Sequence, residues 1–136
     1  MKRSATAVLN GTGKDGNGIV STQSSVLSKA QYSYKSRFEN GTGTNPEELV
    51  AAAHAGCFSM KLAFVLNEAG FTADEINTDC TITLESTGIT SSHLVLKAKV
   101  PGIDKAKFDA AAADAKANCP ISKLLNTNIT LDATLL

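Results

Sequence analysis

The feature that most constrains the fold is an apolar stretch from Val50 to Leu66, which contains only three polar side chains, His54, Ser59 and Lys61. A helix that is apolar on nearly all faces belongs in the centre of a fold, so we expect a central helix that ends at Gly70. A membrane span is the alternative, because about 17 residues is the lower limit for crossing a bilayer. The lysine, the histidine and the many alanines favour a buried helix.

The residues before this stretch predict where the helix begins. Asn45 can cap it, Pro46 suits the first helical position, and Glu48 can complete a capping box with Asn45. Glu47 and Glu48 also suit the positively polarised end of a helix. The helix is therefore expected to begin at Pro46.

Three short strands are expected before the helix. Residues 4–9 and 18–24 are separated by glycine-rich turn sequences, which predicts a hairpin. Aromatic and polar residues then alternate from Tyr32 to Phe38. This pattern is typical of a strand with one packed face, and it places Arg37 on the more polar face.

Two strands, two helices and a last strand are expected after the central helix. Alternation over 76–86 and 90–100 predicts an antiparallel pair. A capped, alanine-rich helix over 104–118 and a short helix over 120–126 follow, and a strand over 127–135 closes the chain. The order of these elements is that of an α+β fold.

The composition indicates a single globular domain that spans residues 1–136. Hydrophobic residues make up 43% and charged residues 19%, which excludes a disordered chain. Thirteen basic side chains balance thirteen acidic ones, so no net charge attracts nucleic acid or an anionic membrane. The basic start is not followed by the apolar core of a secretory signal, and we therefore expect a cytoplasmic protein.

Three cysteines are the main candidates for chemistry. Cys119 directly precedes Pro120, so it lies at the positive end of a short helix, which favours its thiolate. Cys57 lies in the apolar helix, where burial raises the pKa of a thiol. Cys80 has the strand parity of Ile82 and is expected to be structural. Spacing alone favours buried, inert cysteines, which are common in cytosolic proteins.

A metal site is a further alternative, because His54 and Cys57 lie one helical turn apart, as two ligands would. No cysteine pair or histidine-rich segment completes such a site, so a packed or hydrogen-bonded His54 is favoured. Gly41 and Gly43 lack the remaining residues of a phosphate-binding loop. Neither a metal nor an organic cofactor is expected.

The stretch R-F-E-N-G-T-G-T-N-P-E-E-L-V-A-A-A-H-A-G-C-F-S-M, from Arg37 to Met60, closely resembles the signature of the osmotically inducible protein C and organic hydroperoxide resistance family. Shorter matches at 100–104, 119–122 and 128–132 extend the likeness over nearly the whole chain. The resemblance implies the fold of that family, in which antiparallel strands pack around a long buried helix in an intertwined homodimer.

The resemblance also implies a site and a reaction. The arginine, glutamate and two cysteines of the family fall on Arg37, Glu47, Cys57 and Cys119, in a pattern similar to the osmotically inducible branch. Arg3 is the only other arginine and remains the alternative cation. The implied activity is reduction of organic hydroperoxides through a Cys57 sulfenic acid and a Cys57–Cys119 disulfide, which a dithiol such as dihydrolipoamide reopens.

The chemistry of these residue types suits that reaction. A thiolate must attack the peroxide, and a planar arginine held by a carboxylate can stabilise both the thiolate and the developing oxygen charge. Phe58 and Met60 are expected to offer apolar surface beside Cys57 for an alkyl or aryl group. The alternative from another functional class is a non-catalytic redox sensor or small-molecule binding module on the same scaffold, which would not turn over.

Helix geometry gives an independent reason to expect a dimer. Ten residues separate Glu47 from Cys57, so on one straight helix they stand about 15 Å apart along the axis and roughly 80° apart in direction. They cannot then share one arginine. Either a second chain supplies Glu47, with or without Arg37, or the helix breaks near Ala51–Ala53. The resemblance favours the second chain.

Overall fold

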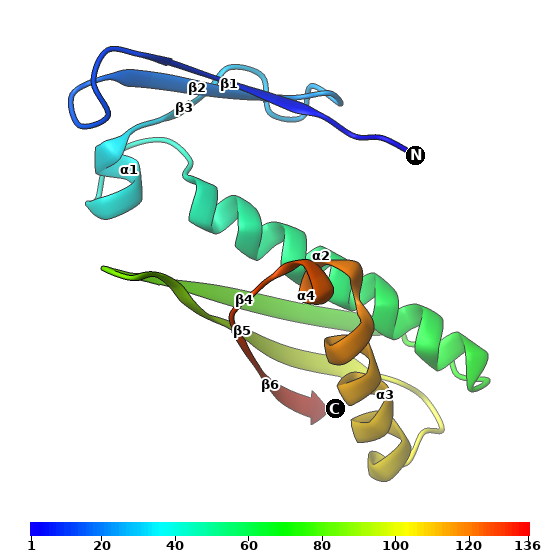
Figure 1. Cartoon of the computed structure of the whole chain (residues 1–136). Helices are drawn as coiled ribbons and strands as arrows, with labels where there is room; N and C mark the ends of the chain where they lie inside the picture. Colours follow the sequence, from blue (N-terminus) through cyan, green and yellow to red (C-terminus); the bar gives the residue numbers. More distant parts are fainter. The chain divides into compact units, whose positions relative to one another are not determined.

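Six strands and four helices follow one another along the chain, in the order β1-β2-β3-α1-α2-β4-β5-α3-α4-β6 (Figure 1). The computed structural model describes every residue, in two units, Met1–Leu49 and Val50–Leu136. The mixed α+β class is confirmed. The elements are β1 Ala5–Asn10, β2 Asn17–Thr22, β3 Ala30–Tyr32, α1 Tyr34–Phe38, α2 Pro46–Glu68, β4 Glu75–Glu85, β5 Gly88–Lys99, α3 Lys105–Asn118, α4 Pro120–Leu124 and β6 Asn128–Leu135.

The first unit is built on a three-stranded antiparallel sheet in the order β1-β2-β3. The expected hairpin is confirmed, with Ala5 opposite Thr22 and Asn10 opposite Asn17. Every residue of β1 is exposed within the single chain. This sheet therefore has little apolar core of its own.

The strand expected over 32–38 is wrong, because β3 stops after three residues and α1 takes most of this segment. The Ser36 N–H donates to the Ser33 hydroxyl at 3.2 Å, and the Ser33 N–H donates to the Ser36 hydroxyl at 2.8 Å. This reciprocal capping box starts a helix. Tyr34 and Phe38 alternate as in a strand, but they are also one helical turn apart, with ring centroids 4.8 Å from each other.

The start of α2 agrees with the sequence except in one detail. The Glu48 N–H donates to the Asn45 side-chain oxygen at 2.8 Å, so Asn45 caps the helix that begins at Pro46. The expected return bond from Glu48 to the Asn45 backbone is absent. The Glu48 carboxylate instead accepts the Thr44 hydroxyl at 2.6 Å, which competes for the same oxygens.

The helix is unbroken to Glu68, so the expected alternative of a break near Ala51–Ala53 is wrong, and Gly70 turns the chain with φ +90°. The helix was expected to be central because it is apolar on nearly all faces, and in the single chain only one stripe of it is buried. By length and composition α2 would also suit a membrane, but one stripe of it packs in the core of the second unit. The buried stripe consists of His54, Phe58, Leu62 and Leu66.

The second unit contains a three-stranded sheet in the order β4-β5-β6. The expected antiparallel pairing of β4 and β5 is confirmed, but β6 runs parallel to β5, so the sheet is mixed rather than antiparallel throughout. A parallel neighbour needs a long crossover. Here α3 and α4 supply it.

One face of β5 and one face of α3 complete the core around the α2 stripe. The alternation expected over 90–100 is confirmed in β5, since every second residue from Ser92 to Ala98 is buried while Lys97 and Lys99 are exposed. Asp104 caps α3 by accepting the Lys107 N–H at 2.8 Å. The core residues beside the stripe are Leu94, Leu96, Ala98, Val100, Phe108, Ala111, Ala112, Ala115 and Cys119.

Candidate functional site

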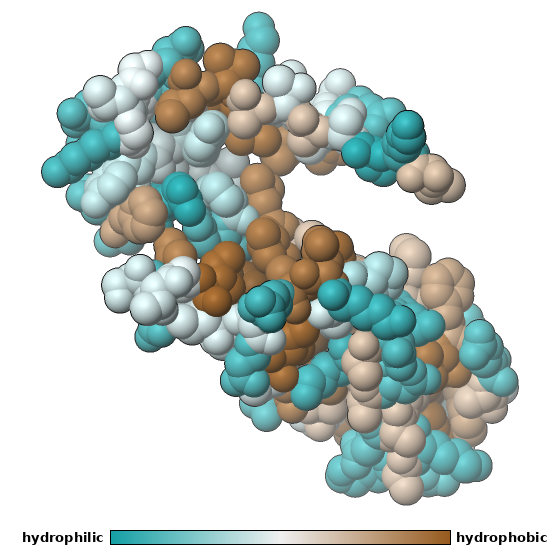
Figure 2. Space-filling view, in the orientation of Figure 1, coloured by the Kyte–Doolittle hydropathy of each residue, from teal (hydrophilic) through white to brown (hydrophobic).

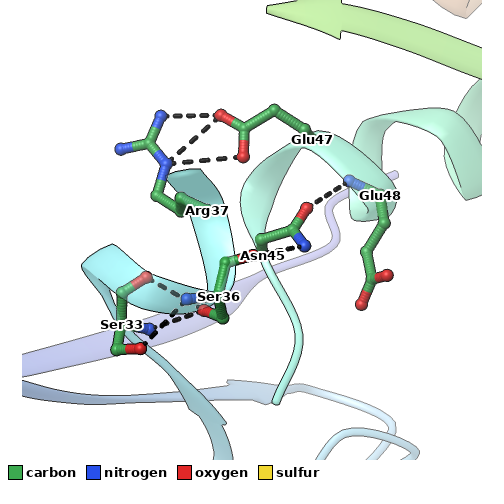
Figure 3. A network of polar contacts seen from close by, with 6 residues as sticks. All are labelled: Ser33, Ser36, Arg37, Asn45, Glu47 and Glu48. Atoms are coloured by element: carbon green, nitrogen blue, oxygen red, sulfur yellow. Dashed lines mark hydrogen bonds and ion pairs between the residues drawn. The ribbon is translucent and has the colours of Figure 1, made fainter. Parts of the chain in front are cut away.

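The predicted arginine and glutamate form an ion pair within the first unit (Figure 3). Arg37 Nη2 donates to Glu47 Oε1 at 2.7 Å, and Arg37 Nε lies 3.2 and 3.4 Å from the two carboxylate oxygens. The hydrogen bonds that the guanidinium donates to Glu47 raise the pKa of Arg37. The guanidinium also lies 5.0 Å from the centre of the Phe38 ring. The planar guanidinium, held in place by Glu47, can bind an anion beside the aromatic ring of Phe38.

The local sequence fixes this pair in place. Asn45 donates from its side-chain nitrogen to the Ser36 carbonyl at 3.0 Å while its oxygen caps α2, so one side chain ties α1 to α2 (Figure 3). Arg37 comes directly after Ser36, and Glu47 comes two residues after Asn45. The Arg3 guanidinium donates hydrogen bonds only to Lys2 and Met1, so the carboxylate of Glu47 pairs with Arg37 and not with Arg3.

Cys57 and Cys119 come together within the second unit. The Ile121 N–H donates to Cys57 Sγ at 3.5 Å, and Cys119 is the capping residue of the same short helix, α4. Both thiols are free; Cys119 is fully buried and Cys57 is half-buried. Burial raises the pKa of Cys57 and the neighbouring Cys119 thiol raises it further, whereas the Ile121 N–H lowers it. Cys57 therefore needs a positive charge to attack as a thiolate.

A cavity of about 460 Å³ lies beside Cys57. Its apolar wall comes largely from exposed side chains of α2, and Figure 2 shows such apolar surface along this helix. The prediction that Met60 flanks Cys57 is confirmed, whereas Phe58 points into the core and not into the cavity. The cavity is lined by Gly56, Cys57, Met60, Lys61, Phe64, Asn118 and Pro120.

Cys80 lies on the face of β4 that packs on the core, as its parity with Ile82 predicts. Its sulfur lies 3.3 Å from the hydroxyl of Ser92. Burial raises the pKa of Cys80, and the Ser92 hydroxyl lowers it by less. Cys80 is thus a thiol of the core.

His54 is fully buried, and both of its ring nitrogens are hydrogen-bonded. This confirms the prediction of a packed, hydrogen-bonded histidine. Nδ1 lies 2.6 Å from the Ser92 hydroxyl and Nε2 lies 2.8 Å from the Ser122 hydroxyl. Burial lowers the pKa of His54. No group of three or more His, Cys, Asp or Glu residues that could hold a metal ion is present.

The sequence did not identify Ser92 and Ser122 as partners of His54. One sequence feature of each residue could have indicated it. Ser92 has the strand parity of Leu94, so it is a polar residue on a core face. Ser122 is the third residue of α4, where its N–H reaches the capping Cys119 sulfur at 3.3 Å.

Comparison with known proteins places the chain in a family. The family described as OsmC-like protein matches residues 39–134. The chain is 48% identical over 123 residues to peroxiredoxin OsmC of Escherichia coli strain K12, covering 88% of this chain and 86% of that protein. It is 33% identical over 98 residues to an organic hydroperoxide resistance protein of Xanthomonas axonopodis pv. citri, covering 70% of this chain and 68% of that protein.

Solved structures agree in fold. An OsmC-like protein from Mycoplasma pneumoniae has a TM-score of 0.79 at 15% identity, covering 100% of this chain and 98% of that one. The organic hydroperoxide resistance protein OhrB of Bacillus subtilis has a TM-score of 0.66 at 25% identity, covering 96% of this chain and 98% of that one. Since the family match and the relatives span most of its length, this chain belongs to the OsmC-like protein family.

Proposed function

We propose that this protein is a thiol-dependent peroxidase that reduces organic hydroperoxides to alcohols. The observation that carries the proposal is the pair of neighbouring free thiols, Cys57 and Cys119, of which Cys57 lines an apolar cavity. The names of the relatives, peroxiredoxin and organic hydroperoxide resistance protein, support a peroxide-related redox role.

The Cys57 thiolate attacks the terminal oxygen of the hydroperoxide in the first step. The O–O bond breaks, the alkoxide takes a proton and leaves as an alcohol, and Cys57 becomes a sulfenic acid. In the second step Cys119 attacks the Cys57 sulfur, water leaves, and a disulfide forms before further oxidation occurs. A dithiol such as dihydrolipoamide then returns both cysteines to thiols, which is suited to a cytoplasmic protein.

The cavity favours a substrate with an organic group. Met60 and Phe64 are 63% and 59% exposed in the single chain and line the space beside Cys57. Burying an alkyl or aryl group there stabilises the complex by about 0.8 kcal/mol per methylene. Hydrogen peroxide has no such group to bury.

We further propose that the site is completed in a homodimer by Arg37 and Glu47, with at least Glu47 coming from a second chain. Because α2 is unbroken, Glu47 and Cys57 of one chain stand about 15 Å apart along its axis. The exposed apolar faces of α2 also favour burial against another copy. In that arrangement Glu47 orients the guanidinium, which favours the Cys57 thiolate and the charge that develops on oxygen.

A peroxide assay with an aromatic hydroperoxide and a dithiol tests the activity. Cys57→Ser is expected to abolish turnover, because a serine hydroxyl is not ionised at neutral pH. Cys80→Ser is the matched control and is expected to keep near-normal turnover. Peptide mapping of the oxidised protein should find a Cys57–Cys119 bridge. A disulfide that forms without turnover would favour the redox sensor, and a bridge from Cys80 would refute the cysteine assignment.

Mixing inactive subunits tests the shared site. Cys57→Ser and Glu47→Ala proteins are combined under conditions that exchange chains. If each site draws Cys57 from one chain and Glu47 from the other, some mixed dimers hold one intact site and activity returns. A fully active monomer in sedimentation experiments would contradict the homodimer.

A further inference from the structure

A continuous hydrogen-bonded chain runs through the core of the second unit and ends at the resolving cysteine. It begins at Cys80, passes through Ser92 to His54, and continues through Ser122 to Cys119. The successive contacts are Cys80 Sγ to Ser92 Oγ at 3.3 Å, Ser92 Oγ to His54 Nδ1 at 2.6 Å, His54 Nε2 to Ser122 Oγ at 2.8 Å, and Ser122 Oγ to Cys119 Sγ at 3.0 Å.

Four of the five members of this hydrogen-bonded chain are buried. His54, Ser92 and Cys119 are 0% exposed, and Ser122 is 7% exposed. Burying polar groups in an apolar core is unfavourable unless each is satisfied, and every member here has a partner. One end of this hydrogen-bonded chain is Cys119, the thiol that must lose its proton before the disulfide can form.

We propose that His54, acting through the Ser122 hydroxyl, accepts the proton of the Cys119 thiol when Cys119 attacks the Cys57 sulfenic acid. This inference rests on the proposed function and adds a role that none of the four site residues performs. His54 does not touch the peroxide; it is a positioning and proton-accepting residue for the second step only.

The proton path requires one tautomer. Neutral histidine carries a single ring proton, and in the productive form Nδ1–H donates to Ser92 while Nε2 accepts the Ser122 hydroxyl. The Cys119 thiol donates to the Ser122 oxygen. When the Ser122 proton moves to Nε2, the Cys119 proton moves to Ser122. The Cys119 thiolate then accepts two bonds from Ser122, one from the hydroxyl and one from the N–H at 3.3 Å.

The atoms of the step balance. The Cys119 thiolate attacks the Cys57 sulfur, the S–S bond forms and the S–O bond of the sulfenic acid breaks. The leaving hydroxide takes the proton held on His54, by way of solvent, and departs as water. The Cys57 sulfur is reduced and the Cys119 sulfur is oxidised, so no further oxidant is needed.

The surroundings of His54 keep it ready to accept a proton. The titratable groups linked to it are Cys80 beyond Ser92 and Cys119 beyond Ser122, and Cys57 comes three residues later on its own helix. No carboxylate joins the chain to favour the imidazolium, and burial lowers the pKa of His54. At neutral pH His54 is therefore uncharged. The closing step should slow only as the pH falls below the usual histidine range and His54 becomes protonated.

The test separates the two steps in a single turnover. Reduced protein is oxidised with one equivalent of hydroperoxide; trapping with a dione reports the Cys57 sulfenic acid, and non-reducing mass spectrometry reports the disulfide. His54→Gln can still bond to both serines but cannot accept a proton. We expect it to slow disulfide formation by roughly 10²-fold at neutral pH, while the sulfenic acid forms at nearly the native rate.

The pH profile distinguishes proton transfer from packing. In the native protein, the rate of disulfide formation should be constant near neutral pH and should fall in acid. In His54→Gln and in Ser122→Ala the rate should rise steadily with pH, because base from solvent must then remove the thiol proton. His93→Gln changes the only other histidine, which is on the opposite face of β5, and should leave both the rate and the profile native.

Two results would overturn the proposal: a native closing rate in His54→Gln and Ser122→Ala, or a slower rate with an unchanged pH profile. If His54→Gln does not fold, Ser122→Ala decides alone. If native Cys57 does not react with hydroperoxide, the proposed function fails instead. The rate of disulfide formation can then be measured with diamide, because Cys119 must attack a Cys57–diamide adduct to form the same disulfide.

Discussion

The two units of this chain divide its chemistry between them. The first unit contains both arginines and no cysteine, whereas the second contains all three cysteines and no arginine. A thiolate peroxidase needs a cation beside sulfur. If Arg37 is that cation, neither unit is sufficient for the proposed reaction.

The units also differ in how they hold polar groups. The Arg37–Glu47 pair keeps contact with solvent, with side chains 36% and 13% exposed. The polar groups around His54 are uncharged and almost fully buried. Burying an ion is far more unfavourable than burying a satisfied neutral group. In the proposed reaction, the core that holds the thiols carries protons along neutral partners, and the surface pair Arg37–Glu47 supplies the charge.

Among the changes that test this division of chemistry, removal of the resolving thiol should have the largest effect on turnover. Cys119→Ser leaves the charged pair and the attacking thiol unchanged, so the first oxidation should proceed and turnover with a dithiol should then stop. Mass spectrometry of the treated variant should find Cys57 as a sulfenic acid or a more oxidised product. Sustained native turnover in this variant would show that Cys119 is not the resolving residue.

Removing the cation should have the next largest effect. Arg37→Met should slow oxidation of Cys57 by about 10²–10³-fold, the loss typical of one donor to a developing oxyanion. Arg37→Lys should recover little, because an ammonium cannot form the fork seen with Glu47. The rate is measured by stopped flow with one equivalent of hydroperoxide.

Arg3→Met is the matched control for this experiment. Arg3 is exposed and contacts only Lys2 and Met1, so its loss should leave the rate of Cys57 oxidation native. A large loss in Arg3→Met with a native rate in Arg37→Met would transfer the cationic role to Arg3.

The contrast between the units also explains what the sequence could predict. Local signals were reliable: the Asn45 cap, the parity of β4 and β5, and the position of Cys119 before α4 were all confirmed. The error over 32–38 arose because alternation across so few residues fits a strand or a helical turn, and the Ser33 capping box decided between them.

The remaining features depend on contacts between distant residues. Nothing local in β6 indicates that it pairs parallel to β5. His54 is 38 residues from Ser92 and 68 from Ser122 in sequence, so a single sequence cannot show that one imidazole joins them. The apolar pattern of α2 predicted its role in the core but not that only one stripe is buried in the single chain.

The apolar cavity gives a smaller, selective effect. Phe64→Ala should lower the catalytic efficiency for an aromatic hydroperoxide by about tenfold, since it removes apolar area that would cover the ring. The efficiency for hydrogen peroxide should hardly change. Val26→Ala, at a site 84% exposed in the first unit, is the control. Equal losses for both peroxides would mean that Phe64 supports the site or a dimer contact and not substrate binding, and sedimentation would separate these two.

The smallest effect should come from Asn45, which is the counterpart of His54 in the first unit. Each side chain bridges two elements through two polar contacts, but Asn45 is only half-buried and its partners can turn to water. Asn45→Ala should therefore lower the free energy of unfolding by about 1 kcal/mol, the usual cost of a lost cap. His54→Ala should cost more, because its loss leaves buried hydroxyls with fewer partners.

Asn45→Asp refines this last comparison. A carboxylate still accepts the Glu48 N–H and suits the helix start, but it cannot donate to the Ser36 carbonyl as the amide does. Its loss of stability in urea unfolding should be smaller than that of Asn45→Ala. If Cys57 oxidation slows in Asn45→Asp although the cap is kept, the bond to Ser36 also positions Arg37 against Glu47. A native rate would confine Asn45 to stability, and the ion pair would then hold its geometry through its own three short contacts.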